Sequence, residues 1–110
     1  MNDVNNSTSI IGCSLKLFSK PYYRGDSLEI TKNMEDLEDF DDKAVTATLN
    51  GSCCWDIFGE QNFEGTYKTL KPSIDYIEAN SFGLELFRNV SSVARNEFCI
   101  DWNMYNSKFT

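Results

Sequence analysis

Acidic side chains gather in one short stretch and are the first candidates for chemistry. Residues 35–42 read EDLEDFDD and end in the neighbouring pair Asp41 and Asp42. The chain has a net charge of −7, which suits cations and disfavours nucleic acid, because a phosphate backbone is held by a positive surface. Taken alone, the acidic run has the composition of a solvated loop. We therefore expect no nucleic-acid partner. Whether the acidic run has a function depends on its position in the repeat described below.

Catalytic chemistry has little support in this composition. The chain contains no histidine, which excludes Cys/His and Ser/His nucleophilic sites as well as histidine-based acid–base catalysis. A carboxylate pair remains, but Asp41 and Asp42 are adjacent in sequence, whereas the two acids of a glycosidase face one another across the sugar. We predict that the protein is not an enzyme.

The chain has four cysteines, Cys13, Cys53, Cys54 and Cys99. An even number permits a disulfide framework and does not demand one. A zinc site built from all four is disfavoured, because the side chains of residues 53 and 54 would project to opposite faces of a strand. We interpret Cys13 and Cys53 as buried apolar filler, and the disulfide state of all four cysteines stays open.

An internal repeat supplies the elements that would position these groups. Residues 13–25 align without a gap with residues 53–65, and apolar residues alternate along both copies as they do in a strand with one buried face. Each copy then has an aromatic residue, a second aromatic five positions on, and a glycine two positions later. We expect each hairpin to be closed by its two aromatics, with the glycine in a backbone conformation that a Cβ would resist. These residues are Phe18, Tyr23 and Gly25, then Phe58, Phe63 and Gly65.

Further strands are predicted in both copies. A second strand is expected at residues 27–31 and 66–70, and a final strand near residues 45–49 and 91–95. No helical period is convincing, and the turns are rich in Gly, Asn and Asp. Together these features predict an all-β fold, a two-sheet Greek-key sandwich of about eight strands.

The paired motifs resemble those of the βγ-crystallin superfamily, in which an aromatic, four residues, an aromatic, any residue and a glycine follow in order. The resemblance covers residues 13–95 and includes the serine pair Ser91 and Ser92 near the end of the second motif. It implies one domain, with motif one at residues 13–50 and motif two at residues 51–95. We expect residues 1–12 to be a flexible segment, and the aromatic-rich residues 96–110 to form an extension that packs on the domain.

The resemblance also implies calcium sites. Many microbial and invertebrate members bind two calcium ions through paired stretches of the form Asn/Asp, Asn/Asp, two variable residues, Ser/Thr, Ser. In the first motif both acids are present, as Asp41 and Asp42, while Val45 replaces the ligating hydroxyl. In the second motif the hydroxyl is present, while both acids are gone. The residues there are Phe87, Arg88 and Ser91.

These two defects are complementary, because family members exchange ligands between motifs. One site is implied to receive the Asp42 carboxylate, the Asp41 carbonyl, the Ser91 hydroxyl and the Ser19 carbonyl, and to bind one calcium ion with weak to moderate affinity. The alternative is that Asp41 and Asp42 only shape a turn and Ser91 caps a strand bend, as in vertebrate lens members that have lost calcium sites.

The second site is expected not to bind calcium. It would draw on Phe87, Arg88, Val45 and the Gly59 backbone, and a guanidinium repels a metal ion. We expect Arg88 to occupy the vacant cleft and to pair with a carboxylate such as Glu60.

No window of about 18 apolar residues exists, so no transmembrane segment is expected. The first residues lack the pattern of a secretory signal, which favours a cytoplasmic protein, with secretion as the alternative. Glycosylation sequons at Asn5, Asn6, Asn50 and Asn89 would matter only in that alternative. We predict a non-enzymatic, calcium-binding structural or stress-type protein that is a monomer. The alternatives are a secreted interaction or toxin-like module and a calcium-independent structural crystallin.

Overall fold

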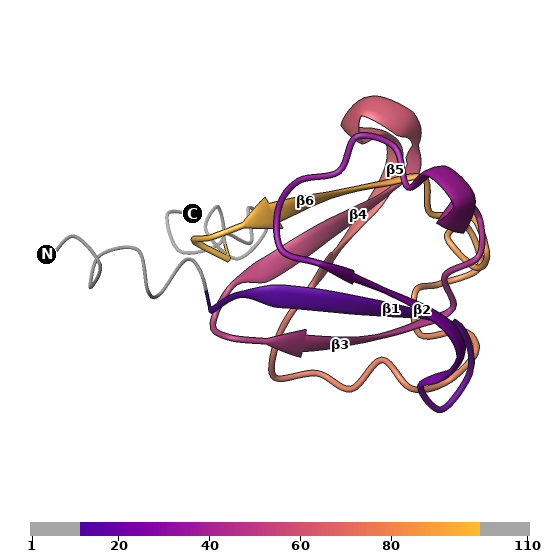
Figure 1. Cartoon of the computed structure of the whole chain (residues 1–110), viewed down its shortest axis with the longest axis horizontal. Helices are drawn as coiled ribbons and strands as arrows, with labels where there is room; N and C mark the ends of the chain where they lie inside the picture. Colours follow the sequence, from indigo (N-terminus) through magenta and orange to yellow (C-terminus); the bar gives the residue numbers. More distant parts are fainter. Residues whose placement is uncertain (1–11, 100–110) are drawn as a thin grey trace, which may run out of the picture.

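The computed structural model describes residues 12–99, and these residues form six strands and two short 3₁₀ helices (Figure 1). The predicted flexible segment falls almost wholly on residues 1–11, which lie outside the described residues. In chain order the elements are β1 Ser14–Lys20, β2 Arg24–Ile30, η1 Glu38–Phe40, β3 Thr46–Asn50, β4 Cys54–Glu60, η2 Gln61–Phe63, β5 Glu64–Leu70 and β6 Ser92–Asn96.

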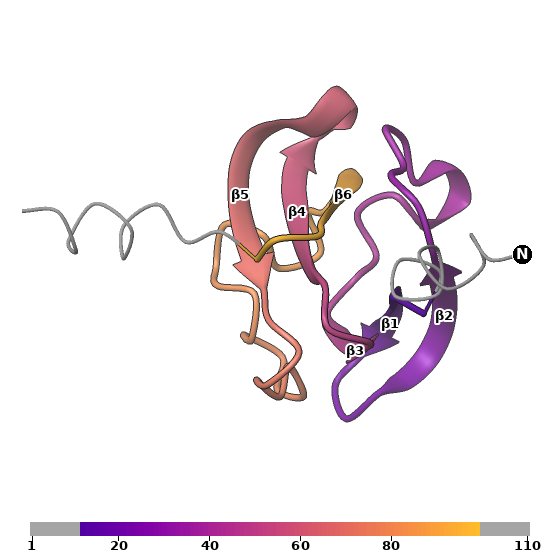
Figure 2. The same ribbon diagram turned by 90° about the vertical axis from the view of Figure 1, so that its left-hand side faces the viewer.

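The strands form two antiparallel sheets that face one another (Figure 2). One sheet has the order β2-β1-β3 and the other has the order β5-β4-β6. Each repeat thus supplies its first strand to the centre of a sheet, with its second and last strands on either side. The prediction of an all-β, two-sheet fold is confirmed.

The alternating residues of the repeat form the core between the sheets. Leu15 and Leu17 of β1 and Trp55 and Ile57 of β4 are fully buried, while the intervening Lys16 is exposed. An antiparallel strand with one solvated face has this alternation, because successive side chains point to opposite faces. The sequence therefore placed the central strands of both sheets correctly.

Both hairpins close as the aromatic–glycine spacing predicted. The rings of Phe18 and Tyr23 lie 5.6 Å apart, and those of Phe58 and Phe63 lie 5.9 Å apart. Gly65 has φ +83°, and a Cβ there would come 2.9 Å from Glu60 Cγ. Such a backbone angle favours glycine strongly, which explains the fixed position of this residue in both copies.

The two halves are interlocked by the segments that follow each hairpin. Met34, from the first half, pairs with Val93 at the edge of β6, and Tyr76, from the second half, pairs with Ala47 of β3. These are single bridges and not strands, so the expectation of about eight strands is corrected to six. The crossing segments nevertheless cover one edge of each sheet, which a Greek-key connection requires.

All four cysteines form disulfides, Cys13 with Cys53 and Cys54 with Cys99. Cys13 and Cys53 are buried, as expected, but our interpretation of them as mere apolar filler was wrong. They occupy the same place in the two repeats, just before β1 and β4, and their Cα atoms lie 5.8 Å apart. The Cys54–Cys99 bond ties the start of the C-terminal extension to β4, and the packing expected of residues 100–110 lies outside the described residues.

Candidate functional site

The candidate site lies where the segments before β3 and before β6 run against each other. Val45 N–H donates to the Phe18 carbonyl at 2.7 Å, and Ser91 N–H donates to the Phe58 carbonyl at 2.8 Å. These two bonds are equivalent, since Phe18 and Phe58 are aligned in the repeat. Each segment is thereby anchored to the central strand of its own sheet.

Two further bonds cross between the motifs. Asp42 N–H donates to the Val90 carbonyl at 3.0 Å, and Arg88 N–H donates to the Ala44 carbonyl at 3.3 Å. The backbones of the two segments are therefore held side by side by a pseudo-symmetric pair of hydrogen bonds. This arrangement permits an acid of one motif to meet a hydroxyl of the other.

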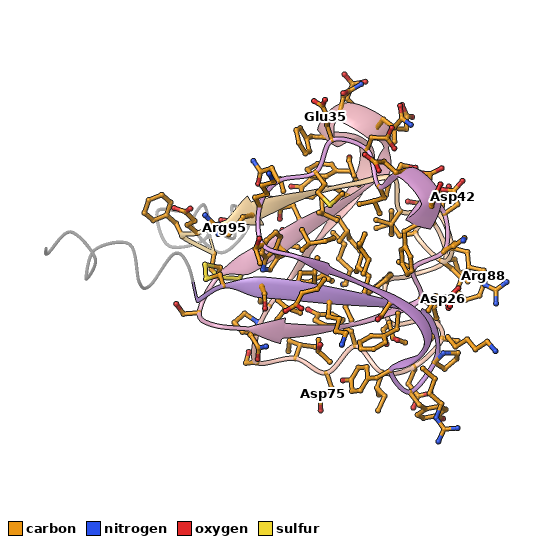
Figure 3. All side chains as sticks on the ribbon, in the orientation of Figure 1. Asp26, Glu35, Asp42, Asp75, Arg88 and Arg95 are labelled. Atoms are coloured by element: carbon orange, nitrogen blue, oxygen red, sulfur yellow. A yellow bond between two sulfur atoms is a disulfide. The ribbon has the colours of Figure 1, made fainter. Side chains whose placement is uncertain are left out.

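Asp42 and Ser91 do meet in this way. The Ser91 hydroxyl donates to Asp42 Oδ1 at 3.4 Å, across 49 positions of sequence. Asp42 has φ +62°, a conformation that Asp and Asn tolerate better than most residues. The side chain lies at one end of the molecule, well away from Arg95 (Figure 3). The expected approach of the front-half acid to the back-half hydroxyl is thus found in the structure.

Asp41 precedes this pair and carries an unsatisfied oxygen. It ends η1, and its N–H donates to the Glu38 carbonyl at 3.0 Å. Its Oδ1 is inaccessible to solvent and has no hydrogen-bond donor among the described residues. A buried carboxylate oxygen without a donor is costly, so this oxygen has capacity for a ligand.

Ser19 lies at an irregularity of the β1–β2 pairing, between Phe18 and Lys20. Its hydroxyl accepts a hydrogen bond from the Asp26 N–H at 2.8 Å. Gly59 has the equivalent place in β4, at the irregularity between Phe58 and Glu60. The role of the Ser19 carbonyl as a calcium ligand stays a prediction. A Cβ on Gly59 would lie 3.6 Å from the Asn89 carbonyl oxygen.

The opposite half contains Arg88 where the first half contains Asp42. Arg88 has φ +53°, close to that of Asp42, and its guanidinium lies 5.5 Å from the centroid of the neighbouring Phe87 ring. No ion pair between Arg88 and Glu60 is present in residues 12–99, so the expected pairing is wrong. Val45, in the place of the hydroxyl, is buried.

The donors around Asp42 fit a calcium ion better than a transition metal. They are oxygens, the Asp42 carboxylate and the Ser91 hydroxyl, and the Asp41 carbonyl is the predicted backbone ligand. Hard oxygen ligands suit Ca²⁺. Within residues 12–99, no three His, Cys, Asp or Glu side chains cluster as a metal site, and the cysteines are oxidised. The residues present therefore fit calcium held partly by neutral oxygens and water.

A separate acidic groove lies on another part of the surface. It has a volume of about 600 Å³ and contains neither Asp42 nor Ser91. Glu35, labelled in Figure 3, marks its position. Its lining residues are Asn33, Met34, Glu35, Asp36, Glu38 and Phe63. Glu35, Asp36 and Glu38, three of the six acidic residues of the run detected in the sequence, line this groove. The described residues contain no helix long and apolar enough to cross a membrane.

None of the family models and none of the curated proteins compared with this chain matches it. Several solved structures match this chain. A βγ-crystallin from Ciona intestinalis is 24% identical, with a TM-score of 0.67 over 76% of this chain and 99% of that one. An archaeal βγ-crystallin is 19% identical, with a TM-score of 0.67 over 76% and 98%. IPSE/alpha-1 from Schistosoma mansoni eggs is 22% identical, with a TM-score of 0.60 over 77% and 84%.

These likenesses agree with the architecture derived from the strands themselves. Two repeats with closed hairpins, swapped edge segments and facing three-stranded sheets account for nearly the whole length of the solved domains. The chain has the βγ-crystallin fold.

Proposed function

We propose that this protein is a non-enzymatic structural domain that binds one calcium ion between its two motifs. The observation that carries the proposal is the contact of the Ser91 hydroxyl with the Asp42 carboxylate. It joins an acid from one repeat to a hydroxyl from the other, and Asp41, whose carbonyl is the predicted backbone ligand, directly precedes that acid in the chain. The Asp41 and Ser19 carbonyls and water would complete the six to eight oxygen ligands that calcium takes.

The affinity follows from the small number of charges at the site. Two carboxylates at most, with neutral oxygens otherwise, correspond to a dissociation constant on the order of 10⁻⁵ to 10⁻³ M. An ion bound this weakly is better suited to stabilising a fold in a calcium-rich medium than to sensing small changes in concentration. A structural or stress-type role is therefore the one we propose, without catalysis.

Isothermal titration with calcium tests this proposal. The wild-type chain should bind one ion, Asp42→Ala should lose the binding heat, and Asp75→Ala should retain it. Asp75 is an exposed aspartate far from Asp42 (Figure 3), which makes it a matched control for the loss of one negative charge. Two equal sites, or no heat from the wild-type chain, would refute a single calcium site.

The monomeric state belongs to the same proposal. The open edges of the sheets are β2 and β5, and both carry charged side chains, including Arg24, Asp26 and Glu64. Charged edge strands resist pairing with another sheet edge. Light scattering should therefore give the mass of one chain, and a stable dimer would contradict this expectation.

A second candidate, a secreted interaction module, is favoured by one observation. The two disulfides together use all four cysteines. Stable disulfides are typical of secreted proteins and rare in the cytosol. On this ground we propose an oxidising compartment rather than the cytoplasm. Protein alkylated at the moment of lysis of its native cells should contain no free thiols. Four free thiols would instead support a cytoplasmic protein.

A further inference from the structure

We propose that Asn50 is an acceptor of an N-linked glycan and that Asn89 is not. Both begin sequons of the form Asn-X-Ser, at Asn50-Gly51-Ser52 and at Asn89-Val90-Ser91. The inference rests on the secretory route suggested by the two disulfides and is independent of calcium. The sequons at Asn5 and Asn6 lie outside the described residues.

Asn50 is open to a large substituent. It is the last residue of β3, and the whole Asn50-Gly51-Ser52 sequon is exposed. Its backbone is paired with Ser14 of β1, while its side-chain amide has no hydrogen-bond partner within residues 12–99. A glycan on its Nδ2 would displace no interaction of the described fold and would project into water.

The turn that follows Asn50 is closely packed and lies beside a disulfide. Gly51 has φ +92°, and a Cβ there would come 2.9 Å from the Gly12 carbonyl oxygen. Two residues later Cys53 is bonded to Cys13. Asn50 therefore ends β3 and the cross-linked Cys53 follows it three residues later, so the sugar would shield this disulfide end of the domain.

Asn89 is also exposed, but its side-chain amide is hydrogen-bonded. Its Nδ2 donates to the Glu85 carbonyl at 3.0 Å, and a Cβ on Gly59 would be 3.6 Å from the same nitrogen. The nitrogen that would be modified thus lies between one carbonyl and the backbone of β4. The hydroxyl residue of its sequon, Ser91, is buried and bonded to Asp42. A glycan at Asn89 would have to displace these contacts at the proposed calcium site.

The two sequons lie at opposite ends of the sheets. β3 runs away from the segment that carries Asp42, and its end at Asn50 lies on the far side of the molecule (Figure 1). A strand of five residues spans about 16 Å. Glycosylation at Asn50 would therefore leave the calcium site accessible, and the two properties are separable by experiment.

The chemistry needs one co-substrate, a lipid-linked oligosaccharide diphosphate, and the cell's own transferase. A bond forms between the Asn50 Nδ2 and the first sugar carbon as the bond from that carbon to the diphosphate breaks. The amide loses one proton, and the lipid diphosphate leaves with its electron pair. The exposed Asn50-Gly51-Ser52 sequon is accessible to this enzyme on the folded domain, and disulfides form in the same compartment.

The test is expression of the full chain behind a cleavable signal in eukaryotic cells, with secreted and retained protein both analysed. Peptide mapping after enzymatic deglycosylation should find Asn50 converted to aspartate and Asn89 unchanged. Asn50→Gln and Ser52→Ala should each abolish the glycan on this peptide. Ser52→Ala is the sharper variant, because it keeps the acceptor amide and removes only the hydroxyl of the sequon.

Site-specific mapping separates the outcomes. An unmodified Asn50 in a chain with both disulfides formed would overturn the glycan while leaving the secretory route intact. Modification of Asn89 to the same extent as Asn50 would overturn the structural selection between the sequons. The glycosylated wild-type chain could fail to bind calcium while Asn50→Gln binds it. That result would contradict the claim that a glycan at Asn50 leaves the calcium site accessible.

Discussion

Asp42 and Arg88 occupy the same place in the two halves of the molecule. Both have positive φ, at 62° and 53°, and each donates its N–H to a carbonyl of the opposite motif, Val90 for Asp42 and Ala44 for Arg88. One position thus carries an acid and its counterpart carries a cation. This difference is the physical basis for expecting one calcium site and not two.

The second site should be recoverable by substitution. Arg88→Asp would supply the acid that corresponds to Asp42, and Val45→Thr would supply the hydroxyl that corresponds to Ser91. The positive φ that the acid needs is already present at residue 88. Calcium titration should then give two ions per chain. Arg88→Asp alone is the control and should give one ion per chain, because the second site still lacks its hydroxyl. A stoichiometry of one in the double variant would contradict the equivalence of the halves.

Calcium should stabilise the folded chain. If the ion binds only the native state, calcium at about a hundredfold excess over its dissociation constant adds about 2.7 kcal/mol to the free energy of unfolding. For a domain of this size that raises the unfolding temperature by roughly 10 to 20 °C. Ser91→Ala should lower the calcium-dependent increment in a thermal melt. An equal increment in this variant would show that the ion binds elsewhere.

Each of the two disulfides should contribute strongly to stability without calcium, and the Cys13–Cys53 bond is the first example. It closes a loop with a sequence separation of 40, for which loop-closure entropy amounts to about 4 kcal/mol. The double variant Cys13→Ala, Cys53→Ala should therefore unfold at much lower urea concentration. The Cys54→Ala, Cys99→Ala pair is the comparison, with a similar separation of 45. Unchanged urea midpoints in both variants would count against native disulfides.

Alkaline pH should weaken the fold through Tyr76. Burial raises the pKa of the Tyr76 hydroxyl above its ordinary value of 10.0, against an opposing effect of the Lys71 N–H that donates to it and of the Lys71 charge. Because the folded pKa is higher than the unfolded one, the contribution to stability is present below the ordinary pKa. It is lost as pH rises through the raised value.

Urea unfolding from about pH 9 to about pH 11 measures this effect. The free energy of unfolding of the wild-type chain should fall over this range. Tyr76→Phe should show a smaller fall, because the phenylalanine ring has no proton to lose. An identical pH dependence in the variant would assign the alkaline loss to other groups.

Much of the fold could be read from local spacing. The aromatic–glycine pattern fixed both hairpins, because ring packing at Phe18–Tyr23 and the positive φ of Gly65 depend on residues only a few positions apart. The strand count was less accurate. Met34 and Tyr76 each form a single bridge to the opposite half, and such a short crossing leaves no periodic signal in the sequence.

The site was predictable in part for the same reason. The approach of Asp42 to Ser91 followed from the exchange of ligands between repeats, but the carbonyl partner depends on sheet register. Ser19 lies at an irregularity of the β1–β2 pairing, which the spacing of residues in the sequence does not reveal. The cysteine pairing could not be predicted from the sequence either. Cys13 and Cys53 meet only because the fold brings the starts of β1 and β4 together.

A crystal structure grown in excess calcium would test the central claim most directly. We expect one ion, with the Asp42 carboxylate and the Ser91 hydroxyl within coordination distance, about 2.3–2.6 Å from the metal, and no ion beside Arg88 and Val45. Occupation of the Arg88 side, or a calcium-saturated crystal in which Ser91 still bonds Asp42 with no metal between the motifs, would contradict the account.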